Sequence, residues 1–181
     1  MIATLLGAGT TNGGSEVTGP GPLSVGPSGY LPPGRHAATW ADVRTLFVDQ
    51  APHTEHRRSL YRALQGWLNS MRTLLPTGGT AWLNGGFVTH KTSPPKDVDV
   101  VLMVHDADVM GLTPTDEILV RSQLTDRSAG TQPMGGLVDA FIAQHGNARE
   151  ELIWDTTWSA VKDDTGLIVP GAAKGYLEVS W

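Results

Sequence analysis

The chain has 181 residues, no cysteine, and a formal net charge of −5 that arises from 18 acidic and 13 basic residues. This length suits one domain with a real hydrophobic core. The lack of cysteine excludes a disulfide framework and thiolate metal sites, and the mild acidity argues against a large basic surface for nucleic acid.

The first 29 residues are rich in Gly, Pro, Ser and Thr and show neither helical nor strand periodicity. Such a segment cannot bury enough apolar area to offset its ordering entropy, so we predict a disordered arm over residues 1–29 and a domain over residues 30–181. The N-terminus lacks the basic segment of a signal peptide, and no run approaches membrane-spanning length. We therefore expect a cytoplasmic protein without a membrane partner.

Two helices are predicted at the start of the domain. Thr39 is suited to cap a short helix over residues 40–48. A longer helix is predicted over residues 54–75, because apolar residues recur there at i, i+3, i+4 and i+7. We expect this helix to end at Pro76, and we expect its residues 56–58 to form a solvated face.

Strands follow the two helices, with one further helix between them. The segment 151–161 is open to either structure, and its Trp and β-branched content favours a strand. The expected strands are residues 80–84, 97–104, 135–143, 151–161 and 174–181, and the expected helix is residues 114–126. This order of elements indicates an α+β domain.

Asp97 and Asp99 interrupt the otherwise apolar strand at residues 97–104. Side chains two residues apart leave a strand on the same face, roughly 6.5 Å apart. Burying two unpaired carboxylates together is costly, and a bound cation is the leading compensation. Mg²⁺ prefers oxygen ligands and is commonly completed by water and substrate phosphates. The pair therefore predicts a magnesium site, with Mn²⁺ as the other candidate.

A glycine pair, Gly85-Gly86, precedes the aspartates. Glycine permits positive φ and close approach of the backbone to a ligand, and N–H groups exposed at such a turn can bind phosphates. The hydroxyl of Thr89 and the charges of Lys91 and Lys96 are further candidates for phosphate contacts. For the two lysines, a solvated position without a ligand is an equally good interpretation.

The glycine pair, ten intervening residues and Asp97-Val98-Asp99-Val100 together resemble the signature of the DNA polymerase β-type nucleotidyltransferase superfamily. Residues 29–43, 83–102 and 174–181 are similar to a family of small bacterial and phage-associated proteins within it that has no settled function. The resemblance runs from about residue 29 to the end of the chain. Gly86 departs from the Ser that is usual in this narrower family, so backbone N–H groups or Thr89 would have to bind phosphate.

The resemblance implies a small mixed β-sheet packed by helices and a metal-dependent enzyme. That enzyme would move a nucleoside monophosphate from an NTP, such as ATP, to a hydroxyl of an acceptor. It also implies a third carboxylate, which helps to hold the metal and accepts the proton of that hydroxyl. Asp139 is favoured, because an isolated acid in an apolar strand needs a partner. Glu178 is the alternative; it alternates with Tyr176 and Ser180, as on the solvated face of an edge strand.

Several alternatives remain open at the level of sequence. The acceptor is an RNA end, a protein or a small molecule, and a partner protein or a second copy would supply its binding surface. A defence or toxin–antitoxin setting follows by analogy only. The rival function is a catalytically degenerate module of the same fold that binds nucleotide or a protein. We reject zinc at His53 and His56, which lack the required spacing, and we expect Trp154 and Trp158 to pack rather than stack a base.

Overall fold

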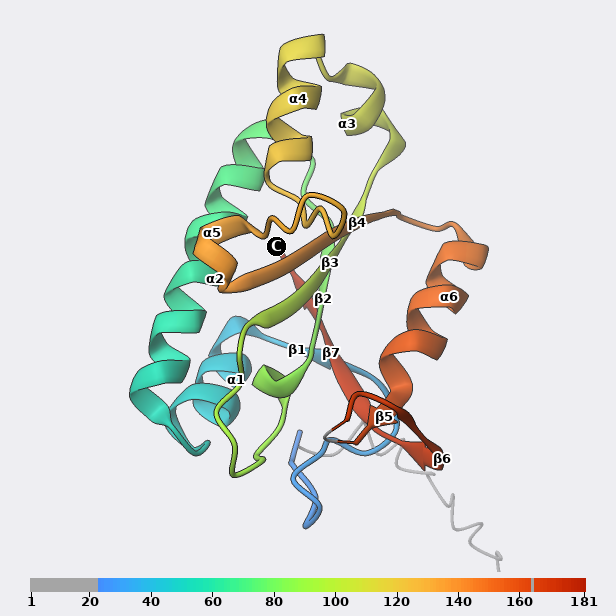
Figure 1. Cartoon of the computed structure of the whole chain (residues 1–181). Helices are drawn as coiled ribbons and strands as arrows, with labels where there is room; N and C mark the ends of the chain where they lie inside the picture. Colours follow the sequence, from blue (N-terminus) through green and yellow to red (C-terminus); the bar gives the residue numbers. More distant parts are fainter. Residues whose placement is uncertain (1–22, 164) are drawn as a thin grey trace, which may run out of the picture.

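Five strands form one mixed sheet in the computed structural model, which describes residues 23–163 and 165–181 (Figure 1). Their order across the sheet is β1 (Gly34–Ala38), β7 (Gly175–Ser180), β2 (Thr80–Asn84), β3 (Val98–Val104) and β4 (Val138–Gln144). The outer pairs β1–β7 and β3–β4 are parallel, whereas β2 runs antiparallel to both of its neighbours. The predicted α+β class, with a mixed sheet packed by helices, is confirmed.

The first helices begin where the sequence caps them. Thr39 accepts a hydrogen bond from the backbone N–H of Asp42, and the Asp42 carboxylate accepts one from the Thr39 N–H at 2.8 Å, which completes a capping box. The predicted helix over residues 40–48 is confirmed as α1 (Trp40–Arg44), which widens into the π-helical turn η1 (Thr45–Asp49). The long helix is confirmed as α2 (Thr54–Leu74).

One face of the sheet packs against α2, α1 and η1. Side chains alternate along a strand, and Val98, Val100 and Leu102 of β3 point to this face, where they join the buried side of α2. Trp67 of α2 is fully buried there, and its ring N–H donates to the carbonyl of Gln123 at 2.7 Å. This cluster is the larger part of the core.

The opposite face of the sheet carries α6 (Ala148–Ser159) (Figure 1). The strand predicted over residues 151–161 is wrong for all but its last two residues, because this segment is helical up to Ser159. Asn147 caps the helix by accepting from the N–H groups of Arg149 and Glu150. Trp154 and Trp158, four residues apart, then lie on the same side of the helix and pack on the sheet. The cap and this spacing outweigh the β propensity of the segment.

Shorter elements connect these layers. Between β3 and β4 lie α3 (Asp106–Gly111), the predicted helix as α4 (Pro114–Ser122), and α5 (Pro133–Gly136). The turn η2 (Gly86–Val88) follows β2. A hairpin of β5 (Ala160–Lys162) and β6 (Ile168–Ala173) forms a second, two-stranded sheet between α6 and β7. The sequence did not predict β1, α3 or β6.

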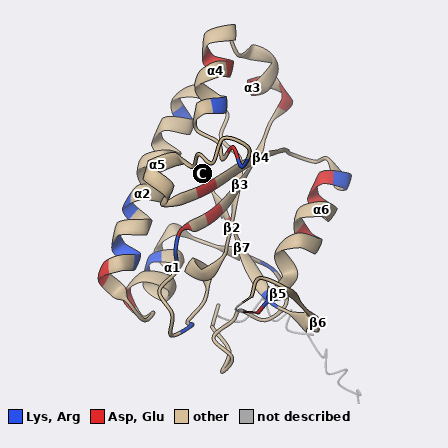
Figure 2. Ribbon diagram, in the orientation of Figure 1, with Lys and Arg blue, Asp and Glu red and all other residues tan. Residues whose placement is uncertain are grey.

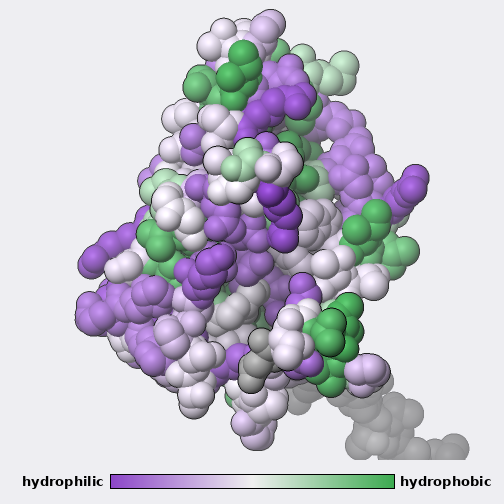
Figure 3. All heavy atoms as spheres, viewed as in Figure 1, coloured by the Kyte–Doolittle hydropathy of each residue, from purple (hydrophilic) through white to green (hydrophobic). Residues whose placement is uncertain are grey.

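The predicted arm lies mostly outside the described residues, which begin at Leu23. Leu23 and Val25 pack, partly buried, against the large core cluster. Exposed apolar side chains form separate groups on the face seen in Figure 3, including Leu152 and Ile153 on α6. No helix among the described residues is long and apolar enough to cross a membrane.

Candidate active site

Three carboxylates gather on the face of the sheet that carries α6. Asp97 directly precedes β3, and Asp99 lies in β3 on the same side as Val101, opposite the large core cluster. In the parallel pairing of β3 with β4, Asp139 stands directly opposite Asp99. Figure 2 shows acidic segments in red on the neighbouring strands β3 and β4. The sheet register thus brings together residues 40 positions apart in the sequence.

The three carboxylates interact electrostatically. Burial, reinforced by the charges of Asp97 and Asp139, raises the pKa of Asp99 to about 6. Burial and the charge of Asp139 also raise the pKa of Asp97. The negative charges around Asp97 and Asp99 therefore make ionisation of these two carboxyl groups less favourable. A cation placed among them would relieve this repulsion, which is the behaviour expected of a hard-metal site.

Asp139 is held differently from the other two carboxylates. It is buried, and its Oδ2 pairs with the Arg127 guanidinium at 3.2 Å. Its Oδ1 is buried and has no hydrogen-bond partner. Within residues 23–163 and 165–181, no three His, Asp or Glu side chains are placed to hold a metal ion by themselves. Because Mg²⁺ usually takes only one or two protein carboxylates, with water and substrate phosphates as its other ligands, the residues present still suit it.

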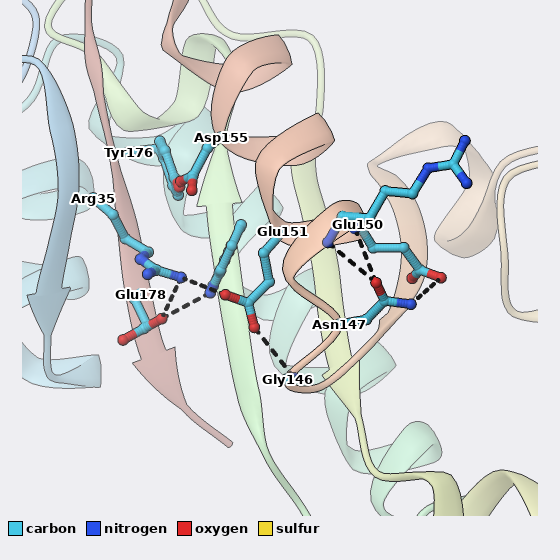
Figure 4. A network of polar contacts seen from close by, with 10 residues as sticks. Arg35, Gly146, Asn147, Glu150, Glu151, Asp155, Tyr176 and Glu178 are labelled. Carbon is cyan, nitrogen blue, oxygen red and sulfur yellow. Dashed lines mark hydrogen bonds and ion pairs between the residues drawn. The ribbon is translucent and has the colours of Figure 1, made fainter.

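Glu178 is placed away from this cluster. The expectation that it lies on an edge strand is wrong, because β7 is flanked by β1 and β2. The Glu178 carboxylate accepts from the Trp82 ring N–H at 2.9 Å and pairs with Arg35 at 3.3 Å. Figure 4 shows Arg35 between Glu178 and Glu151, in a network that joins β7 and β1 to α6. The contacts of Glu178 itself join β7 to β1 and β2, and the link to α6 is the pair of Arg35 with Glu151 at 4.0 Å.

The glycine pair approaches the carboxylates directly. Gly85 has φ of 77°, and a Cβ at this position would lie 1.7 Å from Oδ2 of Asp99. No residue other than glycine fits there, because any side chain would displace the carboxylate. Gly86 begins η2, and a Cβ on it would lie 3.3 Å from Pro95. The position of the Asp99 carboxylate therefore requires glycine at residue 85 of this turn.

Arg57 of α2 stabilises the backbone of this turn. It is fully buried, and its guanidinium donates to the carbonyls of Phe87 and Thr89, each at 2.7 Å. It also donates to the carbonyls of Phe47 and Pro52. The expectation of a solvated face is therefore wrong for Arg57. Carbonyl groups that no helix or strand satisfies have found a donor in this side chain.

Two histidines fix the loop that leads into Asp97. The Nε2 of His53 lies 2.5 Å from the carbonyl oxygen of Thr92, and that of His56 lies 2.6 Å from the carbonyl oxygen of Pro95. A ring nitrogen that faces a carbonyl must carry the proton and donate it. These nitrogens are occupied by the backbone, which gives the pair a structural role.

The three other residues predicted to contact phosphate lie in different surroundings. Thr89 is buried, and its hydroxyl donates to the Gly86 carbonyl at 2.8 Å, so it is used within the turn. Lys91 lines a pocket beside the carboxylates, and its Nζ lies 5.4 Å from the centre of the Tyr30 ring. Lys96 is exposed and is not among the residues that line the pocket.

A pocket of about 500 Å³ lies beside the carboxylates, within the usual size range of small-molecule sites. Of the three acids, only Asp99 lines it. Its other walls come from the Gly85-Gly86 turn, from aromatic residues of β4 and α6, and from the base of the β5–β6 hairpin. Three of its cations were not predicted from the sequence: Arg127, Lys162 and Lys174. No motif marks them, because they belong to separate segments.

Lys174 is the most enclosed of these cations. Its ammonium group donates to Oδ1 of Asn84 at 2.5 Å, and the Asn84 amide donates to the carbonyl of Trp158 at 3.1 Å. Burial lowers the pKa of Lys174 to about 8, although the nearby charge of Asp99 opposes this shift. A positive group is thus fixed close to the carboxylate cluster.

Comparison with known proteins gives one match. The model of a family described as a family of unknown function (DUF6932) matches residues 23–180. No curated protein and no solved structure matches the chain. The matched range includes the whole five-stranded sheet and every residue of the site described above.

Proposed function

The chain belongs to the DUF6932 family, and we propose that it is a Mg²⁺-dependent nucleotidyltransferase. One observation carries the proposal. Asp97, Asp99 and Asp139 share one sheet face, beside a pocket whose other walls hold a glycine turn and several cations. Carboxylates that require a metal, next to cations that require an anion, suit a metal-bound polyphosphate.

The reaction would transfer a nucleotidyl group to a hydroxyl. The acceptor oxygen forms a bond to the α-phosphorus of the NTP, the bond from that phosphorus to the bridging oxygen breaks, and pyrophosphate leaves. Bound Mg²⁺ would neutralise charge on the phosphates during this exchange. Asp97 and Asp99 would hold the metal, and Asp139 would take the hydroxyl proton. Nucleotide preference and the acceptor, whether an RNA end, a protein or a small molecule, are not specified by these residues.

Binding of each of the four NTPs, with and without Mg²⁺, is the first test. The wild type should bind at least one NTP in a Mg²⁺-dependent manner, and the double variant Asp97→Ala/Asp99→Ala should lose that binding. Circular dichroism of the double variant serves as the control for folding. A folded wild type that binds no NTP at any Mg²⁺ concentration would rule out the proposal.

Asp139 and Glu178 offer a matched pair of substitutions for catalysis. Asp139→Asn should reduce Mg²⁺-dependent release of pyrophosphate by roughly 100-fold or more, because it removes the proposed base. Glu178→Gln should leave the rate within about threefold, since this carboxylate contacts Trp82 and Arg35 and a partly exposed pair contributes little. The reverse pattern would transfer the role of third carboxylate to Glu178.

A second candidate function is favoured by the contact of Arg127 with Asp139. In this alternative the protein binds a nucleotide but does not turn it over, because its third carboxylate is permanently neutralised. NTP binding without pyrophosphate release by the wild type would support it, and release by Arg127→Ala would assign the inactivity to this contact. Release of pyrophosphate by the wild type would exclude it.

A further inference from the structure

Lys174 is rigidly placed where the β5–β6 hairpin returns to the sheet. It lies between the end of β6 and the start of β7, and its backbone N–H donates to the Ser159 carbonyl at 2.9 Å. Both ends of its short segment are therefore fixed by regular structure. A lysine with a fixed backbone keeps its ammonium group in a defined position, unlike a lysine on a free loop.

The side chain of Lys174 is anchored at one point and open at others. An ammonium group has three donors, and within the part of the chain that the structure describes only the contact with Asn84 uses one of them. Lys174 also lines the pocket beside the carboxylates. Its remaining donors are thus available to a ligand in that pocket, and their charge selects an anion.

The carboxylates and the cations follow a line across the sheet. Asn84, Asp99 and Asp139 stand opposite one another on β2, β3 and β4, so the row advances by about 4.8 Å at each strand. Lys174 contacts the Asn84 end of this row, and Arg127 contacts the Asp139 end. The Lys174 end is the one enclosed by α6 and the hairpin, because Asn84 binds the carbonyl of Trp158.

We propose that Lys174 binds the outer phosphates of the nucleoside triphosphate, at the β2 end of the carboxylate row. This inference rests on the proposed function and adds the orientation of the triphosphate along the carboxylate row. The inner phosphate then lies over Asp99, the pyrophosphate to be released lies toward Lys174, and the acceptor approaches from Asp139. Lys162, which lines the same pocket, adds a second positive charge beside the outer phosphates.

The assignment predicts that Lys174 senses the number of phosphates in the ligand. A purely structural lysine, held only to fix Asn84 and to balance Asp99, would influence all ligands equally or only the stability of the fold. A lysine that contacts the outer phosphates influences inorganic tripolyphosphate and ATP strongly, ADP less, and AMP hardly at all. The ranking of these four ligands therefore separates the two roles.

The experiment is a calorimetric titration of the full chain with ATP, ADP, AMP and tripolyphosphate, each in excess Mg²⁺. Lys174→Gln should weaken binding of ATP and tripolyphosphate by about 10- to 100-fold, which is the usual effect of losing a charged hydrogen bond. Its affinity for AMP should change by less than about twofold. Lys174→Arg should retain most of the ATP affinity, and Arg72→Gln, at an exposed position of α2 outside the pocket, is the control.

Each outcome has a defined meaning. If the wild type binds ATP and Lys174→Gln binds it equally well, or loses AMP to the same extent, the role of Lys174 is overturned and the proposed function stands. If the wild type binds none of the four ligands, both are overturned. Should Lys174→Gln fail to fold, NMR of the wild type decides: the Lys174 Cε signal must shift with tripolyphosphate and stay unshifted with adenosine.

Discussion

Asp99 carries a charge that destabilises the free protein. Its pKa in the folded chain is about 6, above the ordinary value near 4 that applies to the unfolded chain. The folded state therefore binds the proton more tightly, and stability is lost as pH rises from about 4 through 6. Above that range the ionised carboxylate costs the fold about 3 kcal/mol, because each pKa unit corresponds to about 1.4 kcal/mol.

We therefore expect Asp99→Asn to stabilise the metal-free protein at pH 7 by about 3 kcal/mol, and this advantage should vanish near pH 4. Urea denaturation at several pH values in the presence of a chelator measures it. Asp126→Asn is a control of opposite sign, because hydrogen bonds from Ser128 and Ala129 lower the pKa of Asp126. Equal stability of wild type and Asp99→Asn at pH 7 would contradict the electrostatic account of the site.

Arg57 is a buried cation that stabilises through carbonyl groups. Arg57→Met would leave the carbonyls of Phe47, Phe87 and Thr89 without this donor in the interior. Each unsatisfied buried group costs about 1–3 kcal/mol, so the free energy of unfolding should fall by at least about 3 kcal/mol. Thermal and urea denaturation give the value.

The next residue along the helix is the matched control for Arg57. Arg58 is half-exposed and pairs with Glu55 of the same helix and with Asp49 of η1, so Arg58→Met should change stability by less than about 1 kcal/mol. Similar losses for both variants would mean that the carbonyl contacts of Arg57 add nothing specific. The comparison isolates burial, since the two residues share helix, chemistry and neighbourhood in sequence.

At the scale of elements, the turn between β2 and η2 is the feature most specific to the site. Gly85→Ala should destabilise the protein by about 1–3 kcal/mol through backbone strain and should also abolish Mg²⁺-dependent nucleotide binding, because the new methyl displaces Asp99. Gly86→Ala meets only Pro95, at 3.3 Å, and should keep the fold and most of the binding. Melting temperatures and NTP titrations of the two variants test this prediction. A larger loss of stability or of nucleotide binding in Gly86→Ala than in Gly85→Ala would contradict it.

Helix α6 is an element that joins the pocket to the sheet. The hydroxyl of the fully buried Tyr176 donates to Asp155, and Trp158 packs edge-on against the ring of the same tyrosine. The Glu178 network in Figure 4 holds the other part of the helix. These contacts place the aromatic side chains of α6 as a wall of the pocket, close to the Lys174 anchor.

At the scale of the whole molecule, the two core clusters share one sheet. Trp67 reports the cluster beneath α2, whereas Trp82 and Trp158 report the cluster beneath α6. Because β2, β3, β4 and β7 each contribute side chains to both clusters, neither can unfold while the other remains packed. A single domain of this size usually unfolds in one step.

We therefore expect one cooperative transition, with the same midpoint by far-UV circular dichroism and by tryptophan fluorescence. Trp67→Phe restricts the fluorescence mainly to the α6 side and should lower the midpoint without separating the two signals. Two distinct midpoints in the wild type would show that α6 and the hairpin unfold independently of the sheet.

Local patterns in the sequence predicted the elements that depend on near neighbours. The cap at Thr39 and the apolar stripe of α2 located two helices, and the alternation around Asp97 and Asp99 placed both side chains on one face. Residue 151 onward was misread because the cap at Asn147 lies outside the segment that was judged by propensity. Propensity is a weak prior where a cap and tertiary packing act together.

The sequence by itself therefore determined the α+β composition, the glycine turn and the paired aspartates, since each follows from spacings of a few residues. Only the tertiary structure decided that Asp139 faces Asp99, that the strand of Glu178 is interior to the sheet, and that Arg57, Arg127 and Lys174 surround the site. These contacts join residues 12 to 90 positions apart. Strand order and register depend on which faces can be buried together, and that choice is made by the whole core rather than by any local pattern.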